Sequence, residues 1–177
     1  MHTLAVLIKR SDVSLFYFLN RKMRCQFLSI MMKGMTQLGS TVFSILISAI
    51  FLVLGKWSRE NIGVQLSCTL ILSQIFAQFI KRLVNRPRPY VVLEQAIAIK
   101  PPACQYSFPS GHTCAAFSMA LVLTSNIPAL GIVFISLGTL VGLSRIYLGF
   151  HYPTDVVIGS LTAMVSFLCV SMFLIPM

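Results

Sequence analysis

The chain has 177 residues, of which 56% are hydrophobic and only 10% are charged. Soluble domains carry about 25% charged residues, so this composition excludes an ordinary water-soluble protein and indicates one that lies in a membrane. The net charge of +10 comes from few charged side chains in total. It therefore favours lipid headgroups and phosphorylated substrates as partners and argues against nucleic acid.

Residues 11–38 come first in chain order and mix apolar with basic residues, without an uninterrupted apolar run. This pattern predicts one or two amphipathic helices in the membrane interface, with Lys and Arg reaching the lipid headgroups. We therefore expect an N-terminal interfacial segment at 1–38 and a transmembrane domain at 39–177.

Five later segments are each apolar enough for a membrane-crossing helix, which needs about 20 residues. They are 39–55, 61–80, 111–125, 127–143 and 155–175. The connections between them are short, except for 81–110. The sequence thus predicts an all-α fold, namely an integral membrane helical bundle of about five transmembrane helices plus the interfacial segment.

The second predicted span carries a stripe of polar residues. Ser67, Gln74, Gln78 and Lys81 are spaced seven, four and three residues apart, so they share one face of a helix. Polar groups are costly in lipid and turn inward, so we expect this face to point into the bundle, with Lys81 at its mouth. For the two glutamines, hydrogen bonds between helices are the favoured role.

Three polar clusters lie at the ends of predicted spans: "KRLVNRPRP" at 81–89, "FPSGHT" at 108–113 and "SRIYLGFHYPTD" at 144–155. Counting the membrane crossings places all three clusters on one face of the membrane. There they bring together cations, a hydroxyl, two histidines and one carboxylate, namely Lys81, Arg82, Arg86, Arg88, Ser110, His112, Arg145, His151 and Asp155.

This set of side chains suits the binding and transfer of a phosphate. Fixed cations and a Ser hydroxyl match phosphate oxygens, and a helix that starts at Pro-Ser-Gly-His adds backbone N–H groups. Gly111 lets the backbone approach a ligand closely. Two histidines allow a nucleophile and a proton donor, and Asp155 is spaced to hold the His151 imidazole in one tautomer. A metal site of His112, His151 and Asp155 is the competing interpretation, but a cation-rich pocket with one carboxylate would repel a divalent ion.

The three clusters resemble the three motifs of the type 2 phosphatidic acid phosphatase family. Lys81, six further residues and then Arg88-Pro89 match the first motif, and Pro-Ser-Gly-His at 109–112 matches the second. The third motif is matched by Ser144-Arg145, then His151 after five residues, then Asp155 after three more.

The resemblance implies a role for each matched position. His151 would be the nucleophile that forms a phosphohistidine, Asp155 would orient it, and His112 would be the general acid. The implied phosphate ligands are Lys81, Arg88, Ser110, Gly111 and Arg145. Catalysis in the family needs no metal, so we expect no metal and no other cofactor.

The implied function is that of an integral membrane lipid phosphatase. The small chain favours undecaprenyl diphosphate as the substrate, hydrolysed to undecaprenyl phosphate and phosphate, with phosphatidylglycerophosphate or phosphatidic acid as the close alternative. A lipid phosphotransferase would use the same residues, whereas an anion transporter would leave the two histidines and the carboxylate unexplained. The expected partners are the membrane-embedded substrate, phosphate and bilayer lipids; neither nucleic acid nor an obligatory protein partner is expected.

The sequence gives two conflicting indications of orientation. Of the 14 Lys and Arg residues, all but Lys56 and Arg59 fall on the side of the N-terminus and the three clusters. The positive-inside rule would place that side in the cytoplasm, whereas the family resemblance favours the outer face. We expect a multi-pass protein of a bacterial-type plasma membrane with its site facing outward.

Four conspicuous residues in the clusters are not motif positions. We expect Arg82 and Arg86 to bind lipid headgroups, and Tyr147 and Tyr152 to be aromatic residues of the membrane interface.

Overall fold

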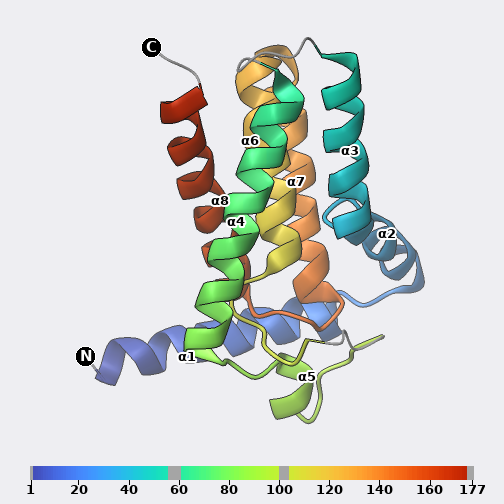
Figure 1. Cartoon of the computed structure of the whole chain (residues 1–177). Helices are drawn as coiled ribbons and strands as arrows, with labels where there is room; N and C mark the ends of the chain where they lie inside the picture. Colours follow the sequence, from blue (N-terminus) through green and yellow to red (C-terminus); the bar gives the residue numbers. More distant parts are fainter. Residues whose placement is uncertain (1, 56–60, 100–103, 175–177) are drawn as a thin grey trace.

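The computed structural model describes residues 2–55, 61–99 and 104–174, and in these ranges its regular structure is helical apart from one isolated bridge between Pro87 and Tyr106. Helices α3, α4, α6, α7 and α8 stand side by side, and α1 lies across their lower end (Figure 1). In chain order the elements are α1 (His2–Tyr17), a π-helical turn (Phe18–Lys22), α2 (Gln26–Gln37), α3 (Thr41–Leu54), α4 (Ile62–Val84), α5 (Pro89–Val92), α6 (Gly111–Asn126), a 3₁₀ turn (Pro128–Leu130), α7 (Gly131–Tyr147) and α8 (Pro153–Leu174).

Two of the upright helices begin at a side chain that caps their first turn. Ser40 caps α3 by accepting from the backbone N–H of Phe43, and Asn61 caps α4 by accepting from that of Gly63. These bonds satisfy N–H groups that have no partner within the helix. Asn85 adopts a left-handed conformation and ends α4 just before the arginine-rich loop.

Each of the five predicted spans contains a helix, and three of these helices are long and apolar enough to cross a membrane. They are α4, α7 together with the preceding 3₁₀ turn, and α8. The pair α2 and α3 passes the same criterion as one broken span bent by 49°. Helix α6 has 16 residues, short of the length for a span by itself. The fold is therefore an all-α membrane bundle, and five spans remains a prediction.

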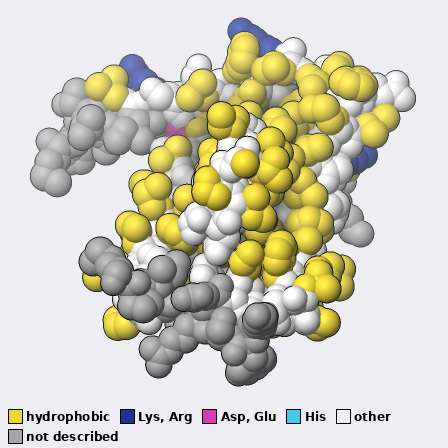
Figure 2. Space-filling model, turned by 90° about the horizontal axis from the view of Figure 1, so that it is seen from above, with side chains coloured by type: hydrophobic (Ala, Val, Ile, Leu, Met, Phe, Trp, Pro, Cys, Tyr) yellow, Lys and Arg dark blue, Asp and Glu magenta, His cyan; other side chains and the backbone are white. Residues whose placement is uncertain are grey.

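Helix α6 occupies the centre of the bundle, where it packs against α4, α7 and α8. Small residues such as Ala115, Ala116 and Ala120 form much of its buried surface, which lets the neighbouring helices approach closely. The outside of the bundle is apolar, with exposed Leu, Ile, Val and Phe side chains. Hydrophobic side chains cover most of the described surface in Figure 2, and Lys and Arg appear near its margins.

The N-terminal segment forms helices as expected and is attached to the bundle by polar contacts. The amide of Asn20 donates to the carbonyls of Ile97 and Tyr147, and α2 packs along α7. The predicted interfacial position of Tyr147 and Tyr152 is wrong, because both rings are buried. The hydroxyl of Tyr147 bonds to the backbone of Cys25 between the π-helical turn and α2, so the docked N-terminal segment covers this ring.

Candidate functional site

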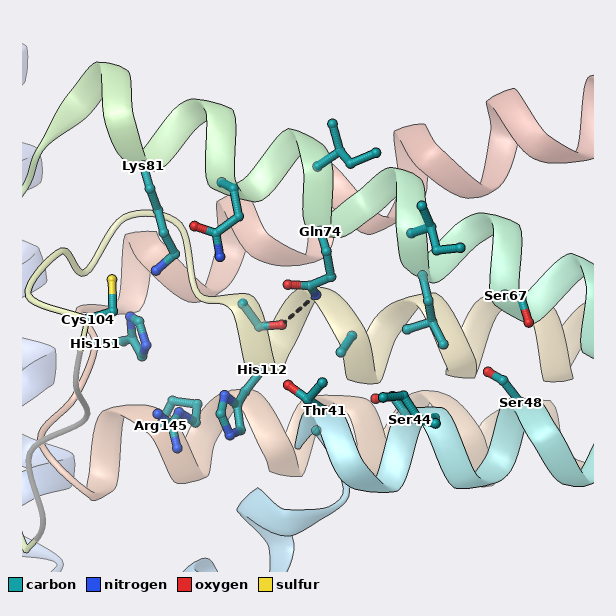
Figure 3. A pocket seen from close by; sticks show the side chains of 18 of the residues that line it. Thr41, Ser44, Ser48, Ser67, Gln74, Lys81, Cys104, His112, Arg145 and His151 are labelled. Atoms are coloured by element: carbon teal, nitrogen blue, oxygen red, sulfur yellow. Dashed lines mark hydrogen bonds between the residues drawn. The ribbon is translucent and has the colours of Figure 1, made fainter.

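The three polar clusters meet at one end of the bundle, where α4 and α7 end and α6 and α8 begin (Figure 1). A cavity of about 790 Å³ opens there and extends between α3 and α4. Six of the eight predicted site residues line it, namely Lys81, Arg88, Gly111, His112, Arg145 and His151. Lys81, His112, Arg145 and His151 gather at one end of the cavity, and Ser48 and Ser67 lie at the other (Figure 3).

His151 lies in the loop between α7 and α8 and is 2% exposed. Its Nδ1 is 2.7 Å from the backbone carbonyl of Ser107, which can only accept a hydrogen bond. Nδ1 therefore carries the ring proton, and Nε2, 3.4 Å from Nη1 of Arg88, keeps its lone pair. Burial, and then the charges of Arg145, Arg88 and Lys81, hold the pKa of His151 well below its usual range, so the ring is neutral.

Asp155 is completely buried in the first turn of α8. Its Oδ2 accepts a 2.8 Å bond from the backbone N–H of Tyr152 and lies 3.5 Å from Nδ1 of His151. Its Oδ1 accepts a 2.8 Å bond from Nη1 of Arg86. The carboxylate thus stands beside the imidazole, while the shorter contact to Nδ1 comes from the carbonyl of Ser107.

The three predicted phosphate-binding cations are buried and held by the backbone or by neutral side chains. Nζ of Lys81 donates to the carbonyl of Tyr106 at 3.3 Å, and Arg88 donates to the carbonyls of Cys104 and Phe150. Burial lowers the pKa of Arg88. Nη1 of Arg145 donates to Thr36 of α2 at 2.7 Å.

The Nε of Arg145 is buried and has no hydrogen-bond partner among the residues that the structure describes. A buried donor without a partner is costly, so this atom marks a place where an acceptor would stabilise the site. Because Arg145 lines the cavity beside two other cations, an anion with several oxygens fits that place best.

Ser110 and Gly111 lie at the start of α6 but face different surroundings. Ser110 is fully buried, and its Oγ accepts from the backbone N–H and the hydroxyl of Thr113, which caps the helix. It does not line the cavity, whereas Gly111 and His112 do. The amide end of α6 thus reaches the cavity through Gly111, and the Ser110 side chain supports that end from behind.

Next to the site, sequence reasoning gave Arg86 the wrong role and missed Asp12. Arg86 does not extend to lipid headgroups as predicted, because its guanidinium pairs with Asp12 at 2.6 Å and with Asp155 at 2.8 Å. Asp12 belongs to α1 and is 3% exposed. The sequence did carry a signal for this pair, because the chain has only 4 acidic residues. A carboxylate buried in such an apolar chain needs a cation as its partner, and an Arg that is not a motif position could supply it.

The predicted polar face of the second span is confirmed, since Ser67, Gln74, Gln78 and Lys81 all line the cavity. The amide of Gln74 also donates to the carbonyl of Gly111, an interhelical bond of the expected kind (Figure 3). Among the described residues, no group of three or more His, Cys, Asp or Glu side chains is arranged to hold a metal ion.

Comparison with known proteins gives a family match and several relatives. The model of the PAP2 superfamily matches residues 62–175, more than half of the chain. A protein of Sulfolobus acidocaldarius named undecaprenyl-diphosphatase is 27% identical over 90% of this chain and 77% of its own length. The undecaprenyl-diphosphatase BcrC of Bacillus subtilis is 30% identical over 71% of this chain and 64% of its own length. The crystal structure of LpxE from Aquifex aeolicus superposes with a TM-score of 0.80 at 26% identity, covering 90% of this chain and 93% of that one.

Proposed function

The chain belongs to the PAP2 superfamily and is a membrane lipid phosphatase, and from this we propose that it hydrolyses undecaprenyl diphosphate to undecaprenyl phosphate and phosphate through a phosphohistidine on His151. The observation that carries the proposal is the 2.7 Å contact of Nδ1 of the buried His151 with the carbonyl of Ser107, which leaves Nε2 as the nucleophilic atom at the cationic end of the cavity. Two relatives named undecaprenyl-diphosphatase support the choice of substrate.

In the proposed reaction, Nε2 of His151 attacks the terminal phosphorus and the bond from phosphorus to the bridging oxygen breaks. The phosphoryl oxygens carry the charge of the transition state, and Lys81, Arg88 and Arg145, which line the cavity, would stabilise it. His112, which must enter this step protonated on both ring nitrogens, gives one proton to the leaving oxygen; its neutral ring then takes one from the water that attacks the phosphohistidine. Inorganic phosphate leaves, and His151 returns to its neutral form.

The shape of the cavity supports a substrate that enters sideways from the bilayer. Ile45 of α3 and Ile71 and Ile75 of α4 line the cavity and are also 57–62% exposed, so it opens between these two helices. The cavity wall on α4 runs from Lys81 to Ser67, a distance of about 21 Å along a helix. A phosphate at the cationic end would leave a long apolar tail between α3 and α4.

The proposed location is a bacterial-type plasma membrane, with the cationic end facing outward.

The test is phosphate release by the purified protein in detergent, with EDTA present. The substrates are undecaprenyl diphosphate, phosphatidylglycerophosphate and phosphatidic acid, and His151→Ala is measured beside the wild type. We expect release that survives EDTA, is fastest with undecaprenyl diphosphate and falls by at least about 10³-fold in the variant. Release that persists in His151→Ala would refute the phosphohistidine. Faster release from another of the three lipids would show that undecaprenyl diphosphate is not the preferred substrate. Transfer to an acceptor lipid, detected by product analysis, would indicate a phosphotransferase.

A further inference from the structure

Asp12 and Arg86 do not line the cavity, yet they are joined to its proposed nucleophile through α8. Nη1 of Arg86 donates to Oδ1 of Asp155 at 2.8 Å and to Oγ1 of Thr154 at 2.7 Å, and Nη2 donates to Oδ2 of Asp12 at 2.6 Å. The guanidinium also lies 3.9 Å from the ring centre of Tyr152, the residue that follows His151.

Asp12 in turn holds the first turn of α8. Its Oδ1 accepts a 2.9 Å bond from the backbone N–H of Thr154, and its Oδ2 accepts a 2.7 Å bond from the Thr154 hydroxyl. A carboxylate at a helix N-terminus is favourable for both its charge and its hydrogen bonds. Here that carboxylate comes from α1, 142 residues away in sequence.

The charges in this network matter as well as its hydrogen bonds. Three cations face the His151 imidazole, and Asp155 is the carboxylate beside it. If Arg86 paired with Asp155 alone, it would cancel that charge. With Asp12 on its other side, the group of two carboxylates and one guanidinium keeps one net negative charge next to the imidazole. That charge would stabilise the positive ring that forms when Nε2 bonds to phosphorus.

Resting on the phosphatase function above, we propose that Asp12 and Arg86 are positioning residues of the reaction. They act through Thr154 and Asp155, fixing the start of α8 and with it the orientation of His151. Helix α1 therefore contributes to catalysis through Asp12, although it lies outside residues 62–175, which the family model matches. The role differs from that of Lys81, Arg88 and Arg145, because neither residue would touch the substrate.

The experiment compares Arg86→Gln, Arg86→Lys and Asp12→Asn in the full chain, using the lipid that ranks first in the assay above. Arg10→Gln is the matched control, because Arg10 is an exposed arginine of α1 that lies outside the three clusters. We expect kcat to fall about 10- to 100-fold in Arg86→Gln and Asp12→Asn, as for residues that orient a reacting ligand, with partial recovery in Arg86→Lys. KM and the inhibition constant of inorganic phosphate should stay within about twofold, because the phosphate-binding cations remain.

The double variant Asp12→Asn/Arg86→Gln shows whether the two residues act through the same network or independently. If both residues act through Asp155, its kcat should be close to that of the worse single variant rather than to the product of both losses. Wild-type kcat in Arg86→Gln would overturn the proposal. So would a loss of kcat, phosphate affinity and thermal midpoint together in all three single variants, which would assign the network to folding. Failure of the proposed function is distinct, because it would appear as release that persists in His151→Ala, or as no release by the wild type from any of the lipids.

Discussion

At the residue scale, Gly111 allows the proposed phosphate contact to be tested without disturbing the fold. Of the described residues, a Cβ added there meets Oε1 of Gln74 alone within 4 Å, at an ordinary contact distance of 3.5 Å. If a phosphate oxygen accepts from the Gly111 N–H, the added methyl group would crowd it. We expect Gly111→Ala to lower kcat/KM at least about tenfold, a loss of ~1.4 kcal/mol, with an unchanged thermal midpoint. Wild-type kcat/KM in this variant would remove Gly111 from the set of phosphate ligands.

The neutral state of His151 predicts how stability depends on pH. Its pKa is lowered by burial and by Arg145, so between the folded pKa and about 6.5 the unfolded chain binds a proton that the folded chain does not. Stability contributed by this residue is therefore present above pH 6.5 and is lost as the pH falls below it. We expect the thermal midpoint to fall more steeply from pH 7 to pH 5 in the wild type than in His151→Gln. Equal slopes in the two proteins would contradict a neutral His151.

The site residues that the sequence could predict are those whose polarity stands out in an apolar chain. These residues fall at the ends of predicted spans, namely Lys81, Arg88, His112, Arg145 and His151. Counting the membrane crossings put these ends on one face of the membrane, and in the structure all five residues line the same cavity. The surroundings of these residues could not be predicted in the same way. The partner of Nδ1 of His151 is the backbone carbonyl of Ser107, and every residue has such a carbonyl, so its identity cannot be read from side chains. Asp12 and Arg86 are 74 residues apart, and their pairing depends on where α1 docks.

At the element scale, the close packing of α8 on the start of α6 is an expected weak point. A Cβ at Gly159 would lie 2.8 Å from the carbonyl of Ser110, which is backbone and cannot rotate away. Gly159→Ala should therefore push the start of α6 away from α8, costing about 1–3 kcal/mol and lowering activity. Gly34→Ala is the control, since nothing lies within 4 Å of a Cβ there. Equal thermal midpoints and rates for the two variants would contradict this close contact.

Helix positions were predictable from hydropathy, while their ends were set by capping and charge. The segment 61–80 extends to Val84 in α4, because Lys and Arg are good helix formers and the left-handed Asn85 ends the helix. The segment 127–143 becomes a 3₁₀ turn followed by α7, which ends at Tyr147. The docking of α1 and α2 was not predictable, because an amphipathic pattern specifies an apolar face but not what covers it.

At the scale of the whole molecule, the orientation can be decided by labelling Cys104. Cys25, Cys68 and Cys104 are exposed, so the first two are replaced by serine and a membrane-impermeant maleimide is applied to intact cells. Cys104 lines the cationic end of the cavity, and we expect it to be labelled before lysis if that end faces outward. Labelling only after lysis would favour the cytoplasmic side, as the distribution of Lys and Arg suggests. Lys56 and Arg59, the two basic residues on the opposite side, lie outside the described residues.

The opening of the cavity between α3 and α4 has a consequence for kinetics. A substrate that arrives through a gap flanked by Ile45, Ile71 and Ile75 is drawn from the membrane and not from the aqueous phase. The relevant concentration is then the mole fraction of substrate in the bilayer or micelle. Adding inert lipid at a constant amount of substrate per volume should slow the enzyme by surface dilution, whereas adding buffer should leave the rate per enzyme molecule unchanged.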